Sequence, residues 1–127
     1  MAKKQQEIHE VESIPWRPVE NCPGVYEKIL NYDPETGSVT RLLKYEPGTR
    51  TEEVLVHDFY EEILVLEGTL IDVRKNLVFK KGYYGYRHPG MEHGPYYSPD
   101  GMITFEIRTY ECKKDKGHGE VESDDRG

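Results

Sequence analysis

The stretch that decides the fold runs from Val56 to Gly68 and reads VHDFYEEILVLEG. In it, acidic residues and one histidine precede an apolar run that ends at a glycine. We predict that His57 closes one strand, that residues 58–60 form a short turn, and that Glu61 opens the next strand. Antiparallel neighbours joined in this way direct an imidazole and a carboxylate at the same volume, and this pair suits a divalent transition metal. A surface turn with solvated side chains explains the stretch equally well. A third candidate ligand elsewhere in the sequence is needed to choose between a metal site and a surface turn.

On both sides of this stretch, short apolar runs alternate with turns that contain glycine or proline. Clear turn signals lie at residues 33–37, 47–48 and 98–101. The runs between turns predict strands at residues 25–30, 38–45, 54–57, 61–68, 69–73, 77–79, 83–87 and 102–110. Since no run shows a convincing helical period, the pattern predicts an all-β domain, either a sandwich or a barrel.

The composition excludes several classes of partner. The chain has 127 residues, enough for one domain with its own core, and a net charge of −7 at pH 7. Such a charge argues against binding to nucleic acid or to an anionic membrane. No apolar run approaches the length of a membrane span, and the polar start does not resemble a signal peptide. Cys22 and Cys112 lack metal-binding spacing, and two free thiols in a cytoplasmic protein are a simpler interpretation than the alternative, one disulfide between them.

The chain divides into a folded middle and two charged ends. Residues 1–13 and 111–127 are poor in large apolar side chains, and we expect a flexible N-terminal arm and a disordered C-terminal tail. The domain is then expected at residues 14–110. It begins with a segment around Trp16 that is bounded by two prolines, which predicts an edge strand packed on the domain or on a second subunit.

A second histidine-containing segment supplies the third ligand. His93 lies in a turn rich in glycine and proline, which allows the backbone to approach whatever the side chain binds. Two imidazoles and one carboxylate, from His57, His93 and Glu61, suit non-haem Fe(II), with Zn, Mn, Ni or Co as further candidates, and leave coordination positions open.

The spacing of these residues matches two short motifs. Six residues separate Glu61 from Gly68, and Gly90 precedes His93 by three. In this respect the chain resembles the cupin superfamily over residues 25–110, and within it the small single-domain group similar to the cupin part of ChrR-type anti-sigma factors. The resemblance implies a jelly-roll β-barrel with a metal in its mouth, often as a homodimer. The matching residues are Gly48, His57, Glu61 and Gly68 in the first motif and Gly82, Pro89, Gly90 and His93 in the second.

The first motif departs from the usual cupin pattern at one position. Leu55 replaces the first histidine of the usual His-x-His, so three ligands remain of the customary four. Glu62 competes with Glu61, because a shift of the strand register by one residue would exchange their directions. His88 is a candidate replacement for the missing ligand, although a supporting or surface role suits its position better.

Other polar residues are candidates for proton transfer or substrate binding near the metal. Glu62 and Tyr60 are the candidates for proton transfer. Tyrosines near the ligand segments and charged mid-strand residues are candidates for substrate binding, with ordinary barrel packing or a solvated outer face as the alternative. Glu106 and Arg108 share one strand face and could pair. The substrate-binding candidates are Arg41, Tyr84, Tyr86, Tyr97 and Arg108; Tyr96 belongs to the same tyrosine cluster.

From this set and the resemblance we expect a metal-dependent enzyme that acts on a small oxygenated or carbonyl compound, most simply an Fe(II) dioxygenase. A lyase or isomerase, in which the metal steadies an enolate, is the nearest alternative. A non-enzymatic sensing module is the third, since in ChrR-type proteins the cupin serves a regulatory partner.

Overall fold

The structure, a computed structural model, describes residues 3–111 of the chain. These residues form a single turn of 3-10 helix, η1 (Val11–Ser13), and eleven strands. None of the helical structure in this part is long and apolar enough to cross a membrane. The strands are β1 (Arg17–Pro18), β2 (Val25–Tyr32), β3 (Val39–Tyr45), β4 (Thr49–Arg50), β5 (Leu55–Val56), β6 (Tyr60–Asp72), β7 (Leu77–Lys80), β8 (Tyr84–Arg87), β9 (Glu92–His93), β10 (Tyr96–Ser98) and β11 (Met102–Thr109).

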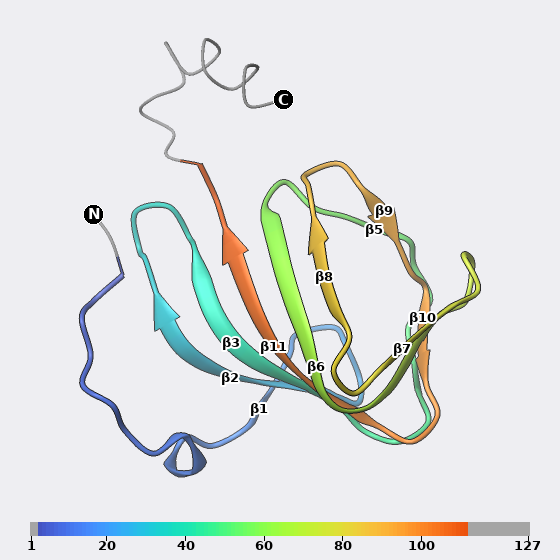
Figure 1. The fold of residues 1–127 in the computed structure, drawn as a ribbon, viewed down its shortest axis with the longest axis horizontal. Coiled ribbons are helices and arrows are strands. Elements are labelled where there is room, and N and C mark those ends of the chain that lie inside the picture. The colour runs from blue at the N-terminus through green and yellow to red at the C-terminus, as the bar shows by residue number, and fades with distance from the viewer. Residues whose placement is uncertain (1–2, 112–127) are drawn as a thin grey trace, which may run out of the picture.

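Strand β6 is the centre of the sheet. The main sheet has the order β1-β2-β3-β11-β6-β10-β4, and both β7 and β8 also pair with β6. The first half of β6 pairs with β11 and β8, and its second half pairs with β10 and β7, always antiparallel. Figure 1 shows the strands curling around a common interior, with β2 and β3 on one side and β5, β9 and β10 on the other. The predicted all-β barrel architecture is confirmed.

A glycine permits β6 to change partners without a break. The sequence predicted two strands that meet at Gly68, whereas the structure has one continuous strand. Gly68 has a φ of 82°, and a Cβ atom there would lie 2.0 Å from the carbonyl oxygen of Gly101. Only glycine fits this position, because any side chain would collide with the backbone of the neighbouring turn.

The segment before β2 packs along the sheet. Trp16 lies beneath two ammonium groups, with Lys28 Nζ 4.8 Å and Lys44 Nζ 4.7 Å from its ring centroid. The next two residues form β1, which pairs with β2 as an edge strand. The arm that precedes it also touches this sheet, since Gln6 Nε2 donates to the carbonyl of Leu30 at 2.9 Å. Cys112 and most of the predicted tail lie outside the described residues.

One hydrophobic cluster forms the core of the barrel. Side chains from both halves of β6 meet side chains from β2, β3, β10 and β11 there. Because alternate residues of a strand face opposite sides, the inward set on β3 is Arg41, Leu43 and Tyr45, all buried. The core members are Val25, Leu43, Tyr45, Val65, Leu70, Tyr96 and Met102.

Candidate metal centre

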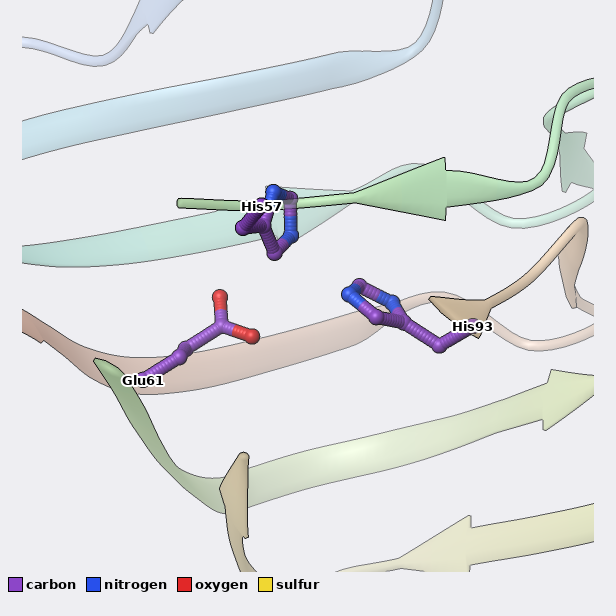
Figure 2. A group of neighbouring side chains, drawn as sticks. All are labelled: His57, Glu61 and His93. Carbon is purple, nitrogen blue, oxygen red and sulfur yellow. The ribbon is translucent and has the colours of Figure 1, made fainter. Parts of the chain in front are cut away.

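Two short strands and the start of β6 bring three side chains together. His57 directly follows β5, and His93 ends β9, which pairs with β5 so that Leu55 lies opposite His93. The backbone N–H of Gly90 donates to the carbonyl of His57 at 2.9 Å, which ties the two histidine segments together. One donor atom from each of His57, Glu61 and His93 lies within 4.8 Å of the others. Figure 2 shows the Glu61 carboxylate and the two rings directed at one shared space.

The two imidazoles are held in the form that binds metals. Burial lowers the pKa of His57 to about 4, and Arg108 contributes to the same shift. Burial, Arg87 and His57 lower the pKa of His93 to about 3. Both rings are therefore neutral near pH 7, with a lone pair available on one ring nitrogen.

His93 has one ring nitrogen in use and one without a partner. Its Nδ1 is paired with the hydroxyl of Tyr96, whose pKa burial raises, so that the phenol stays neutral. Its Nε2 is buried and has no hydrogen-bond partner among the described residues. A buried polar atom without a partner is costly, and a metal ion at the shared space would satisfy it. The residues present therefore fit a divalent transition metal.

Glu61 is a buried carboxylate with partial charge compensation. It is 2% exposed, and its closest cations are Arg87 Nη1 at 3.1 Å and Arg108 Nε at 3.8 Å. Burial raises its pKa, and the neighbouring carboxylate of Glu106 adds to the rise despite these arginines. A further positive charge near Glu61 would stabilise its ionised form, and a bound cation supplies one.

A second buried carboxylate is fully paired. Arg41 Nε lies 2.6 Å from Glu106 Oε1, and Arg108 Nε lies 3.1 Å from the same oxygen, so the predicted pairing of Glu106 with Arg108 is confirmed. Burial opposes ionisation of Glu106, but Arg108 and Arg41 outweigh it and hold its pKa below the ordinary range. Arg41 also pairs with Glu27. These residues form a continuous charged network on the inner face of β2, β3 and β11.

The register of β6 distinguishes the two adjacent glutamates. Glu62 faces outward, where its carboxylate accepts a hydrogen bond from the Tyr84 hydroxyl at 2.7 Å. The predicted competitor for metal binding thus lies on the opposite face from Glu61. His88 is also absent from the ligand group, and its ring instead makes edge contacts with the rings of Tyr60 and Tyr86.

A cavity of about 820 Å³ is lined in part by the three candidate ligands. Of the substrate-binding candidates, Arg41 and Arg108 line it with inward side chains. Tyr84 also borders it, but its side chain lies on the outer face, 62% exposed, where its hydroxyl donates to Glu62. Tyr86 and Tyr97 are not among the lining residues, and neither are the proton-transfer candidates Tyr60 and Glu62. The reason is the alternation of strand faces: Tyr86 pairs across the ladder with outward-facing Glu62, and Tyr97 stacks with Arg50, whose Cζ lies 3.9 Å from the ring centroid.

Sequence reasoning alone assigns no specific role to two residues at this site. Arg87 pairs across the ladder with Glu61, and its guanidinium also lies 6.0 Å from the ring centroid of Tyr96. Tyr96 belongs only to a general tyrosine cluster in the sequence, although its position three residues after His93 is the available signal. Asp72 holds the backbone next to His93, since its Oδ2 accepts a hydrogen bond from the N–H of Gly94 at 2.8 Å.

Comparisons with solved structures agree with this fold. An RmlC-like cupin from Shewanella frigidimarina NCIMB 400 superposes with a TM-score of 0.65 at 16% identity, covering 87% of this chain and 96% of that one. An acetylacetone dioxygenase from Acinetobacter johnsonii gives 0.65 at 19% identity, covering 84% and 77%. The anti-sigma factor ChrR of Rhodobacter sphaeroides, in complex with SigE, gives 0.59 at 22% identity, covering 78% and 51%. At these identities the similarity shows the fold alone.

The sequence comparison identifies the family. No curated protein matches the chain significantly in sequence. A family model for the ChrR cupin-like domain, however, matches residues 4–112, which is most of the chain and contains both histidine segments. The match also agrees with the curled sheet and with the grouping of the three candidate ligands. The chain therefore belongs to the ChrR cupin-like family.

Proposed function

We propose that this protein binds a divalent transition metal through His57, Glu61 and His93 and uses it in a dioxygenase-type reaction on a small oxygenated compound. The observation that carries the proposal is the unpartnered, buried Nε2 of His93 beside two other donors within 4.8 Å. Iron(II) is the preferred metal, because two histidines and one carboxylate are the ligand set of many non-haem iron oxygenases.

The surrounding residues have supporting roles in this proposal. Arg87 and Arg108 orient the Glu61 carboxylate, and Tyr96 orients the ring of His93. All three candidate ligands line the cavity, so a small molecule bound in it would reach the same space. An iron centre would supply the activation of dioxygen, and since both oxygen atoms enter the product, no separate reductant is required. The shared fold with an acetylacetone dioxygenase makes diketones the first compounds to test.

The test begins with metal content. Protein purified without chelator or affinity metal is analysed for bound metals, reconstituted with Fe(II), and assayed for oxygen uptake with diketones, hydroxyketones and catechol-like acids. Uptake that depends on Fe(II) is the expected result. His93→Ala should lose stoichiometric metal while its circular dichroism remains that of a folded β-protein. The matched control is His88→Ala, which should bind metal normally, and an unchanged metal content in His93→Ala would show that the site is assigned wrongly.

The family match favours one second candidate, a metal-binding sensor. ChrR itself is described as an anti-sigma factor in complex with SigE, and this chain covers 51% of it. In a sensor, the same three residues would hold Zn without turnover, and binding would change affinity for a protein partner. Tight Zn with no oxygen uptake in the assay above, together with a specific partner in a pull-down, would favour the sensor over the dioxygenase.

A further inference from the structure

The inner wall of the cavity changes from charged to apolar along the strands. Inward residues that lie opposite one another on neighbouring strands form a row across the sheet. The wall can be followed one row at a time, starting at the candidate metal ligands. The first row contains Glu61 opposite Arg108, and the second contains Ile63 opposite Glu106. Arg41 extends the second row, since it pairs with Glu106 across the next ladder. At this end of the cavity, buried ionic groups therefore predominate.

In the third row, the inward side chains of β3, β6 and β11 carry no charge, and the row continues on β2 with Glu27, which lies opposite Leu43 and pairs with Arg41. Val65 pairs with Thr104, which pairs in turn with Leu43, and beyond them Met102 pairs with Tyr45. Both Val65 and Leu43 belong to the hydrophobic core and also line the cavity. Core side chains thus border the cavity, and in this row the wall is apolar apart from the hydroxyl of Thr104, which has no hydrogen-bond partner among the described residues. A guest that fills this part of the cavity therefore meets mainly apolar side chains. Further apolar residues that line the cavity are Val25, Leu55, Leu70, Phe79 and Met102.

The charged end holds as many arginines as glutamates. Three arginines and three glutamates, buried or half-buried, form the network, and histidines bind metals as neutral imidazoles. With all three glutamates ionised, the network is neutral. A divalent ion at the three ligands adds two positive charges that no protein group in this network compensates. Buried charge needs compensation, so the ion and the two arginines that line the cavity beside Glu61, Arg87 and Arg108, favour a ligand that brings negative charge. The network members are Arg41, Arg87, Arg108, Glu27, Glu61 and Glu106.

From these two ends we infer the substrate class: an amphipathic compound whose anionic, two-oxygen head binds at the metal and Arg108 and whose apolar body occupies the inner chamber. This inference rests on the proposed metal site. A volume of about 820 Å³ is in the range that encloses a drug-sized molecule, so a two-carbon or three-carbon acid would leave most of the chamber unfilled.

The test uses a homologous series on protein loaded with Zn, which binds without turnover. The probes are acetylacetone and analogues in which one terminal methyl group is lengthened by successive methylene groups, all with the same enolate head. Calorimetry should show Kd falling about fourfold per methylene, the factor expected for burial of one CH2 group. Zn content measured after each titration confirms that the metal has stayed in the protein. A series with constant Kd would overturn the apolar chamber as the site of the substrate body.

Variants separate the two ends of the ligand. Val65→Phe should abolish the increase in affinity that each added methylene group brings, while Zn content and acetylacetone binding persist. Phe79→Trp is the second variant if Val65→Phe does not fold. Arg108→Gln should weaken the whole series about tenfold or more and leave the gain per methylene unchanged, as expected for loss of a charge-assisted contact. Lys81→Gln, which removes one exposed charge, is the matched control.

The possible failures are distinguishable. If Arg108→Gln and the unmodified protein bound every probe with equal affinity, the inference that an anionic head group contacts Arg108 would be wrong. An unmodified protein that takes up no stoichiometric Zn, or whose probe binding does not depend on Zn, would overturn the proposed function itself.

Discussion

Glu61 and Glu62 are adjacent on one strand, yet they belong to two different regions of the molecule. Glu61 lies in the interior, 2% exposed, with two arginines and a second carboxylate around it. Glu62 lies on the outer face and bonds to the hydroxyl of Tyr84, a residue that is 62% exposed. The same side chain thus meets a low effective dielectric on one face and water on the other. Charge interactions that decide structure inside are weak outside.

The comparison extends to the neighbouring strands. Inside, Arg41, Arg108 and Glu106 form short contacts with little access to water. Outside, Tyr86 is 51% exposed and Tyr97 is half-buried against Arg50, although the sequence makes them as plausible for substrate binding as Arg108. For this barrel the direction of a side chain, rather than its chemical type, separates candidate site residues from surface residues.

The largest expected difference between the two faces concerns metal binding. Glu61→Ala removes a proposed ligand and should lower metal affinity by more than about 100-fold, beyond the 10–100-fold typical of losing an outer partner. Glu62→Ala should leave metal affinity unchanged, because its carboxylate faces away from the ligands. Metal stoichiometry and competition with a calibrated chelator measure both. If Glu62→Ala lost metal and Glu61→Ala retained it, Glu62 rather than Glu61 would be the inward residue of β6.

The next difference concerns stability, and Glu27 offers a matched pair of cations. Arg41 and Arg17 both pair with Glu27, but their side chains are 9% and 66% exposed. Arg41→Met leaves Glu106 buried with one cation fewer and should lower the free energy of unfolding by about 3–5 kcal/mol. Arg17→Met should cost less than about 1 kcal/mol, because water already screens that pair. Urea denaturation measures both, and equal losses would contradict the contrast between the faces.

Much of the fold could be predicted from local patterns in the sequence. The turn signals and the alternation in the runs around residues 39–45 and 102–110 depend only on neighbouring residues, and the structure has strands there. The choice between Glu61 and Glu62 stayed open, because a shift by one residue satisfies the local pattern equally well. Pairing of β6 with both β8 and β11 fixes that choice, and such pairing is a property of the whole sheet.

The same reason explains which site residues escape prediction. The sequence alone could identify His57, Glu61 and His93 as candidate ligands, because each occupies a fixed position in one of the two short motifs. Arg87 contacts Glu61 only because β8 pairs with β6 at that register, which no local pattern reveals. Tyr97 rather than Tyr96 is the substrate-binding candidate from the sequence, although β10 turns Tyr96 inward and leaves Tyr97 against Arg50.

The two adjacent tyrosines provide the smallest and most specific test. The buried hydroxyl of Tyr96 pairs with Nδ1 of His93, and we expect it to accept the Nδ1 proton, which leaves the Nε2 lone pair directed at the metal. Tyr96→Phe keeps the ring and removes this oxygen, so metal affinity should fall about 10–100-fold. Tyr97→Phe changes an outward hydroxyl on the same short strand and should leave metal affinity unchanged. Spectra of the Co(II)-substituted proteins add a readout that a loss of packing alone would not produce. A shifted ligand-field spectrum in Tyr96→Phe but not in Tyr97→Phe would show that the hydroxyl acts through the His93 ring. Identical spectra and affinities in both variants would show that Tyr96 only fills space in the core.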